Sequence, residues 1–450
     1  MNAKRRPSAF MIMFSKNSHI TSTFCFLIFV ATLHIFAFIA MPIMYGRKEP
    51  IHGFVDPKFE SVKKQFERNF MDGFERDGAN VAIFYKNKPI VNLWAGNADS
   101  ELEKPWTRHT RSLLFSTTKA LSGLCIALLV DQGLLNYNDP VAKYWTEFGQ
   151  NGKENTTVRQ VLNHEAGLPY IDETISLEEA KGDAHEALRK IAAAKPAWVP
   201  GSASGYHPIT YGWLIDGIVR GADPKGRSLK QFFNEEIAKP HGLDIDIGTE
   251  PDQLYRNAKY TVPTNMEYIR DIVHDPRLLG MVMMLYLQHP DAVIWKATKS
   301  PCPYLNPLAS EFPFNNPEYQ QLNLGSATGV SNAHDVAQLF SKVINNEILN
   351  ASLVEELSRP SLNSWHIEKT VLYPIMKGHG FFYDPHPTKV DTFTFGHPGY
   401  GCQALYIDRE TNLVIVYLSN GLKTATSFLC FPYYRLVTES YRVINQINQL

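Results

Sequence analysis

Residues 115–140 read FSTTKALSGLCIALLVDQGLLNYNDP. The part from Thr117 to Gly133 is apolar on nearly every side of a helix, which predicts a helix buried in the core. Ser116 and Lys119 stand three residues apart where this helix begins, so their side chains share one face. Lysine is seldom buried without a partner or a function. This pair is therefore the first candidate for chemistry.

Ser116 and Lys119 have the properties of a nucleophile and its base. A serine hydroxyl is a poor nucleophile until an adjacent group takes its proton. A desolvated lysine near a helix N-terminus is disfavoured as the ammonium ion, so it can accept that proton. The backbone N–H of Ser116 lies at the same helix start, where it can bind an oxyanion. These residues alone also fit a structural alternative, in which Ser116 caps the helix and the ammonium of Lys119 reaches solvent.

The same Ser-x-x-Lys spacing occurs a second time, at Ser61 and Lys64. Residues 57–74 are predicted to form an amphipathic helix whose apolar residues recur at helical spacing: Phe59, Val62, Phe66 and Phe70. Ser61 and Lys64 fall on the polar face of that helix. We interpret this second copy as solvated surface.

Strand-forming sequence lies toward both ends of the chain, and helix-forming sequence lies in the middle. Strands are predicted at 81–85, 90–94, 393–395, 403–407 and 413–418. Helices are predicted at 158–162, 177–194, 211–219, 229–237 and 433–447. We expect an α/β (α+β) fold in which an antiparallel sheet, flanked by helices, is built from both ends of the chain. The α/β part is expected at about 50–135 and 325–450, and an inserted, mainly helical domain at about 136–324.

The composition excludes several classes of protein. The 450 residues are 44% hydrophobic and 20% charged, which is typical of a globular protein with a large core. The net charge of −1 provides no field for nucleic acid, so we expect no nucleic-acid partner. The five cysteines stand singly and no His-Glu-x-x-His occurs, so we expect no metal, no cofactor and at most one disulfide. Nothing in the composition predicts an oligomeric state.

The first 48 residues form a separate segment. They contain no Asp or Glu, and an apolar stretch from about 24 to 45 follows four basic residues: Lys4, Arg5, Arg6 and Lys16. About 20 apolar residues span a bilayer as a helix, and a basic flank before them predicts a cytosolic N-terminus. We expect a signal-anchor with a lumenal or extracellular body, with secretion after cleavage and mitochondrial import as alternatives. Asn155 and Asn350 open Asn-x-Ser/Thr triplets, which makes them candidate glycosylation sites.

Three later segments continue the pattern that begins at Ser116. Residues 161–169 read VLNHEAGLP, 198–201 read WVPG before GYH at 205–207, and 395–399 read FGHPG. In this order and spacing, the four segments resemble the motifs of class C β-lactamases and of the carboxylesterases and penicillin-binding proteins related to them. The chain is also similar to the animal β-lactamase domain-containing proteins. The resemblance implies the β-lactamase/transpeptidase-like fold and acyl transfer through a serine.

The resemblance also implies roles for the matched residues. Tyr206 takes the place of the tyrosine that opens the second motif, where a phenolate beside the lysine accepts the serine's proton. His397 stands where β-lactamases have lysine, and we expect a partly cationic donor for a substrate carboxylate or carbonyl. Gly399 permits close backbone approach, and the N–H of Tyr400 is implied as the second oxyanion donor. A packed aromatic residue and a histidine at a strand end are the structural alternatives for Tyr206 and His397.

Three features depart from the family's pattern. The second motif is typically Tyr-x-Asn, but Pro208 has no side-chain amide to orient Lys119 or to bind the acylamino group of a β-lactam. His207, between the motif positions, is expected to point away. The His-x-Gly form of the third motif is more typical of esterases and peptidases. Cys402 follows that motif, and we interpret it as a strand residue rather than as a second nucleophile.

We therefore predict a serine hydrolase, esterase- or peptidase-like, that forms an acyl-enzyme at Ser116 on a small-molecule or peptide ester or amide. A true β-lactamase is the alternative within this chemistry. A catalytically weak member with a scaffolding or self-assembly role is the alternative from another class. The apolar segment 281–323 is predicted to cover the cleft and to favour an apolar acyl group; a loop packed on its own domain is the other interpretation.

Overall fold

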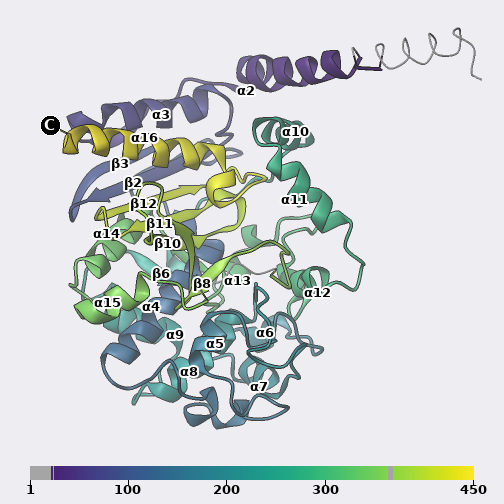
Figure 1. Ribbon diagram of the computed structural model, residues 1–450, viewed down its shortest axis with the longest axis vertical. Coiled ribbons are helices and arrows are strands. Elements are labelled where there is room, and N and C mark those ends of the chain that lie inside the picture. The colour runs from purple at the N-terminus through teal and green to yellow at the C-terminus, as the bar shows by residue number, and fades with distance from the viewer. Residues whose placement is uncertain (1–21, 24, 363–367, 450) are drawn as a thin grey trace, which may run out of the picture.

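A nine-stranded antiparallel sheet lies at the centre of the protein (Figure 1). The computed structural model describes residues 22–23, 25–362 and 368–449. The strands follow the order β1-β3-β2-β12-β11-β10-β9-β8, and β4 pairs with β3. Their bounds are His52–Val55 (β1), Gly78–Tyr85 (β2), Lys88–Asp99 (β3), Lys104–Pro105 (β4), Met376–Gly378 (β8), Phe381–Pro385 (β9), Phe393–Pro398 (β10), Ala404–Asp408 (β11) and Leu413–Ser419 (β12). Because β2 pairs with β12, the prediction of a sheet built from both ends of the chain is confirmed.

The hairpin of β2 and β3 shows how the sequence produces this sheet. Val81 of β2 packs into one hydrophobic cluster and Ala82 into the other, because side chains alternate between the two faces of a strand. Lys86 and Asn87 join the two strands with φ angles of 51° and 59°. Two positive φ angles are what a two-residue turn of type I′ requires, and asparagine tolerates them well.

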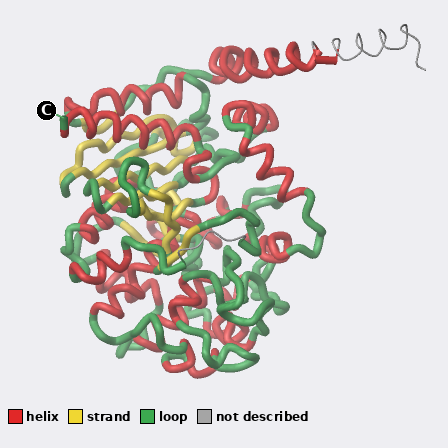
Figure 2. The backbone as a smooth tube through the Cα atoms, viewed as in Figure 1, coloured by secondary structure: helices red, strands yellow, loops and turns green. Residues whose placement is uncertain are grey.

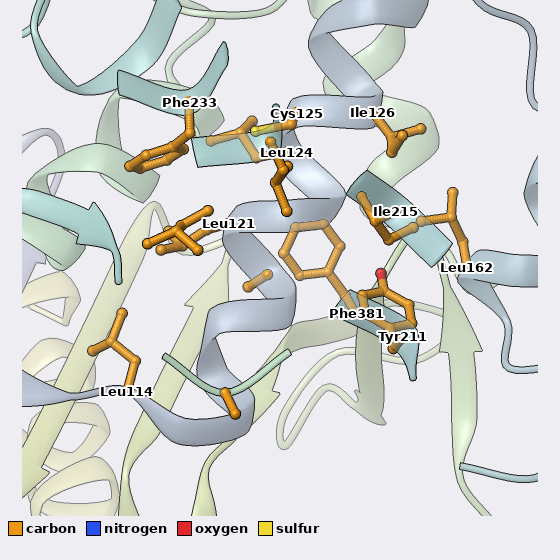
Figure 3. Close-up of a cluster of buried hydrophobic side chains, with 14 of the residues drawn as sticks. Leu114, Leu121, Leu124, Cys125, Ile126, Leu162, Tyr211, Ile215, Phe233 and Phe381 are labelled. Carbon is orange, nitrogen blue, oxygen red and sulfur yellow. The ribbon is translucent and has the colours of Figure 1, made fainter. Parts of the chain in front are cut away.

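Helices cover both faces of the sheet (Figure 1). On one face, α3 (Glu60–Met71) and α16 (Phe431–Asn448) lie side by side. On the other face, α14 (Ala333–Ile344) and the predicted buried helix α4 (Thr118–Asp131) pack against the strands. Figure 3 shows Leu121, Leu124 and Ile126 of α4 beside Ile215 and Phe381 in the middle of the core.

Most of the remaining helices lie in the middle of the chain. Their bounds are Val158–Leu162 (α5), Leu177–Ala180 (α6), His185–Ala193 (α7), Tyr211–Ala222 (α8), Leu229–Phe233 (α9), Asn265–His274 (α10), Arg277–Tyr286 (α11), Val293–Lys299 (α12), Pro317–Gln320 (α13) and Ala351–Leu357 (α15). A small sheet, β5-β7-β6, joins Ser112–Leu113, Gly329–Ser331 and Ile245–Ile247. One helix over 177–194 is a wrong prediction: α6 ends before the extended residue Lys181, and Gly182 and Ala184, with φ angles of 59° and 52°, separate it from α7. The limits of an inserted domain at about 136 and 324 stay a prediction.

Among the described residues, one helix, Cys25–Tyr45, is long and apolar enough to cross a membrane. Figure 2 shows this helix extending away from the body, where most of its length is exposed. A signal sequence near an N-terminus has the same properties. The basic residues at positions 4, 5, 6 and 16 lie outside the described residues, so the orientation across a membrane stays a prediction.

Candidate active site

Ser116 lies where a short 3-10 turn, Phe115–Thr117, passes into α4. Phe115 has a φ of 45°, which is unfavourable for a bulky residue. Its ring packs against those of Tyr260 and Phe314, each at a centroid distance of 5.2 Å, and this packing holds the strained backbone. Ser116 stays partly exposed at this bend, whereas the residues on either side of it are buried.

Lys119 is fully buried, and its side-chain nitrogen is directed at Ser116. Nζ lies 3.3 Å from Ser116 Oγ, 2.8 Å from the carbonyl oxygen of Pro208 and 3.0 Å from that of Ser326. Burial lowers the pKa of Lys119 well below its usual value, which favours the neutral amine. A neutral amine has two N–H bonds and one lone pair. When both N–H bonds donate to the two carbonyls, the lone pair is left for the hydroxyl proton of Ser116.

Tyr206 reaches Ser116 from a distant part of the chain. Its hydroxyl donates to Ser116 Oγ at 2.6 Å. Burial raises the pKa of Tyr206 above its usual value of 10, and the neighbouring Lys119 is itself favoured in its neutral form. Burial therefore disfavours the predicted phenolate, and Lys119, whose Nζ lies 4.8 Å from the centre of the Tyr206 ring, does not offset this burial when it is neutral. The Tyr206 hydroxyl is then a neutral hydrogen-bond donor to Ser116 Oγ, and Lys119 is the group suited to accept the serine's proton.

Pro208 supports Lys119 through its backbone. Pro208 has no side-chain amide to orient Lys119, but its backbone carbonyl accepts a hydrogen bond from Nζ. His207 is turned into the core, where Nε2 accepts from the N–H of Leu168 at 2.9 Å and Nδ1 lies 2.6 Å from the carbonyl oxygen of Gly205. Burial lowers the pKa of His207 to about 3, so it is neutral and structural.

His397 lies in β10, and its ring centroid is 6.1 Å from that of Tyr206. Nδ1 donates to the carbonyl oxygen of Pro398 at 2.8 Å. Nε2 is buried and has no hydrogen-bond partner among the described residues, so it presents a lone pair. Burial lowers the pKa of His397 to about 3. Burial beside Phe382, at a centroid distance of 4.4 Å, removes the solvent that would stabilise a charge and so disfavours the partly cationic form predicted for His397.

Gly399 and Tyr400 form the turn that follows β10. A Cβ atom on Gly399 would lie 2.5 Å from the carbonyl oxygen of Leu114, so the close approach of this turn to the Ser116 segment requires glycine. Cys402 ends this turn with a φ of 82° and forms a disulfide with Cys430, just before α16. Its prediction as a strand residue is wrong, since β11 begins two residues later. The role of the Tyr400 N–H as an oxyanion donor stays a prediction.

A buried ion pair supports the second motif and was not predicted from the sequence. Glu368 and Lys377 are both fully buried, with Nζ 3.4 Å from the carboxylate. The carboxylate of Glu368 accepts the backbone N–H of Tyr206 and those of Thr370 and Val371. This carboxylate therefore joins the segment after residue 367 to Tyr206. No local pattern in the sequence marks either residue, because their partners lie far away in the chain.

Two apolar cavities of about 320 and 340 Å³ adjoin Ser116. Both are lined by Ser116, Tyr206 and Tyr400 and by Leu285 and Ile294 of the segment predicted to cover the cleft. The smaller cavity continues to His397 and Gly399 and past Met281, and the larger continues past Trp295, Ala297, Leu305 and Phe314. Segment 281–323 thus lines the site with apolar side chains rather than packing only on its own domain.

The candidate glycosylation sites lie away from these cavities. Asn155 is exposed. Asn350 is also exposed, but its side chain caps α15 by accepting from the N–H of Leu353 at 2.9 Å and donates to Asp131. The amide of Asn155 is therefore the less constrained of the two.

Comparisons with known proteins agree with this geometry. The model of the family named Beta-lactamase matches residues 64–438. An esterase/beta-lactamase, LipL, of Mycobacterium tuberculosis is 29% identical over 394 residues, which cover 84% of each chain. The crystal structure of a family VIII carboxylesterase superposes with a TM-score of 0.74 and 25% identity, over 88% of this chain and all of that one. A penicillin-binding protein homologue from Caulobacter crescentus superposes with a TM-score of 0.71 and 28% identity, over the same shares.

Proposed function

Because this chain belongs to the beta-lactamase family and is a serine hydrolase, we propose that Ser116 is its nucleophile and that it cleaves esters or amides through an acyl-enzyme. The observation that carries the proposal is the hydroxyl of Ser116 held between two neutral groups of opposite function. Tyr206 donates to Oγ at 2.6 Å, and the lone pair of Lys119 faces the same oxygen at 3.3 Å.

In the first step, Ser116 Oγ attacks the carbonyl carbon of the substrate and its proton passes to Lys119 Nζ. The C–O bond that forms places negative charge on the former carbonyl oxygen. The backbone N–H groups of Ser116 and Tyr400 are proposed to hold that oxyanion. The two carbonyl oxygens beside Nζ stabilise the ammonium ion formed, because they already accept its N–H bonds.

In the second step, the bond to the leaving alcohol or amine breaks and the leaving group takes the proton that Lys119 received. Tyr206 donates to Oγ and lines both cavities, so its hydroxyl can relay this proton. Water then attacks the acyl-enzyme with Lys119 again as base, and Ser116 is released. Lys119 must be neutral at the start of both halves of the reaction.

An ester or amide with an apolar acyl group fits the site better than a β-lactam. The cavities are lined mainly by apolar side chains. Burial favours the neutral form of His397, which stands where β-lactamases have a lysine that is expected to bind the carboxylate of the drug. Pro208 has no side-chain amide for the acylamino group. The similarity to proteins named esterase and carboxylesterase supports the same choice.

We further propose that the helix Cys25–Tyr45 is retained as a membrane anchor and that the body lies on the lumenal or extracellular side. The 21-residue length matches the thickness of a bilayer, since ~20 residues span ~30 Å. In that compartment, Asn155 is the preferred site for glycosylation because its amide is exposed and less constrained than that of Asn350.

A fluorophosphonate probe tests the nucleophile. We expect the full chain in detergent to be labelled, Ser116→Ala to abolish labelling, and Tyr206→Phe to slow it by about 100-fold or more, as for loss of a proton-transfer group. Leu102→Ala, on an exposed turn, is the matched control and is expected to label like the parent. Labelling that survives Ser116→Ala would exclude Ser116 as the nucleophile, and a parent that does not label would exclude the hydrolase mechanism.

A further inference from the structure

Helices α10 and α11 present an apolar surface that no described part of the chain covers. On α11 and the residue after it, Leu279, Met283, Tyr286 and Leu287 are exposed, the last two at 78% each. Ile269 of α10, the helix in contact with α11, is also exposed. Soluble monomeric proteins seldom expose a continuous apolar patch of this kind without a partner.

The opposite side of α11 lines the candidate active site. Leu285 borders both cavities beside Ser116, and Met281 borders the smaller one. Helix α11 is therefore apolar on both sides: one faces the cavities and the other faces outward, and the exposed Tyr286 also borders the larger cavity. A single helix separates the active-site cavities from whatever covers this patch.

The N-terminal helix lies against the same corner of the body. The ring of Phe38 contacts that of His274 at the end of α10 in a tilted arrangement, with centroids 4.1 Å apart, and Ala37 and Met41 are buried. Figure 1 shows the N-terminal helix leaving the body beside α10, with α11 on the side of the body toward which that helix points. If the helix runs along the membrane normal, α10 and α11 are on the side that faces the membrane.

The position of Phe38 in the N-terminal helix also determines how deep its contact with His274 lies in the membrane. Phe38 is seven residues before Tyr45, the last residue of the helix, which corresponds to ~10 Å along the helix axis. A helix of 21 residues just spans a hydrocarbon layer of ~30 Å, so the contact with α10 lies ~10 Å inside the edge of that layer. Amphipathic helices that lie in a membrane interface are buried to ~5–10 Å. The geometry of the anchor thus brings α10 and α11 to interfacial depth.

From this geometry we propose that the outer face of α10 and α11 docks on the surface of the lipid bilayer that holds the N-terminal helix, and that apolar ester substrates reach Ser116 from the bilayer past α11. The proposal rests on the proposed anchor and hydrolase function. The composition of the face suits an interface: it has aliphatic and methionine side chains, the exposed tyrosine Tyr286, and Arg277 at the start of α11. His274 at the contact is favoured in its neutral form, because burial lowers its pKa to about 4.

The docking is measured without reference to catalysis. In a Cys25→Ser background, which removes the exposed free thiol, a fluorophore is attached to Leu287→Cys or to Val390→Cys in the full chain. Val390 is 87% exposed. The next two residues, Asp391 and Thr392, border a hollow together with Glu355 of α15. Helix α15 lies on the side of the body away from α11 (Figure 1). Each protein is reconstituted in phosphatidylcholine vesicles with or without brominated acyl chains.

We expect brominated lipid to quench the label at 287 by at least half and the label at 390 by less than a tenth. Equal, weak quenching at both positions overturns the docking surface, whether or not the protein hydrolyses esters. Energy transfer between copies labelled at 287, without lipid quenching, assigns the face to a second copy of the chain and also overturns it. Quenching at 287 in a protein that a fluorophosphonate does not label supports docking while refuting the hydrolase function.

Substrate delivery is measured with a matched pair of variants. Leu287→Asp is expected to lower the hydrolysis of a long-chain ester dispersed in the vesicles by at least fivefold and to leave the hydrolysis of a soluble acetate ester unchanged. Val390→Asp, which adds the same charge on another face, is expected to change neither rate. An unchanged long-chain rate for Leu287→Asp overturns delivery across this face.

Discussion

The cavity of about 340 Å³ beside Ser116 predicts a steep dependence of activity on acyl chain length. Each methylene group moved from water into apolar surroundings contributes about 0.8 kcal/mol, which corresponds to about fourfold in rate. From a p-nitrophenyl acetate to the hexanoate, four methylene groups amount to about 3 kcal/mol, or about 200-fold in kcat/KM. The rise is expected to end when the chain outgrows the cavity.

The assay is the initial rate of p-nitrophenol release for the acetate, butyrate, hexanoate, octanoate and dodecanoate esters. Each rate is divided by the spontaneous hydrolysis of the same ester, which removes differences in intrinsic reactivity. A kcat/KM that stays within threefold from acetate to octanoate would refute the assignment of this cavity to the acyl group.

A variant of the cavity wall separates this explanation from a general preference for apolar esters. Ala297 is fully buried and lines the cavity from α12, so Ala297→Phe fills part of the space with a ring. We expect the ratio of hexanoate to acetate activity to fall at least tenfold while acetate activity stays within threefold. Trp295→Ala, which enlarges the same cavity, is expected to move the longest accepted chain upward. A thermal melt of each variant shows whether it is folded.

Three further predictions concern ionisation and stability. Because burial lowers the pKa of Lys119 and the neutral amine is the proposed base, kcat/KM is expected to rise with pH through that lowered pKa and then level off. A pH-rate profile should therefore show no loss of activity between pH 8 and 10. A fall over that range would contradict the role of Lys119 as the base. Glu368→Gln leaves Lys377 buried without its counter-ion and is expected to lower the free energy of unfolding by about 3–5 kcal/mol, measured by denaturant titration; an unchanged midpoint would show that the pair is not coupled. Replacing both Cys402 and Cys430 by serine opens a loop closed over a separation of 28 residues, which is expected to cost about 3–4 kcal/mol, and the parent under reductant should lose the same amount.

Much of the fold follows from local patterns. The apolar run at 117–133 predicts α4 because a helix that is apolar on all sides has to be buried, and α4 is buried. The hairpin of β2 and β3 follows from two strand-forming runs around a short polar turn. The prediction of one helix over 177–194 fails because Gly182 and Ala184, which have positive φ, interrupt a segment in which most residues favour a helix.

The candidate site likewise has a part that can be recognised from the sequence and a part that only the fold produces. Ser116 and Lys119 are recognisable from the sequence because the spacing of three and the start of a helix are local properties, and the order of the later segments adds Tyr206, His397 and Gly399. The backbone carbonyls that accept hydrogen bonds from Lys119 cannot be identified from the sequence, because every residue has a backbone carbonyl. The carbonyl of Ser326 lies 207 residues from Lys119, and only the fold brings the two together.

By itself, the sequence determined which residues are proposed to carry the chemistry: a serine and a lysine on one face of a buried helix, followed by a tyrosine and a glycine-rich turn in a fixed order. Only the tertiary structure decided the protonation states in which they act. Burial in the fold favours the neutral forms of Lys119, Tyr206 and His397. The physical reason is that a pKa depends on burial and on partners that meet across the fold, whereas helix and strand periodicities are already present in neighbouring residues.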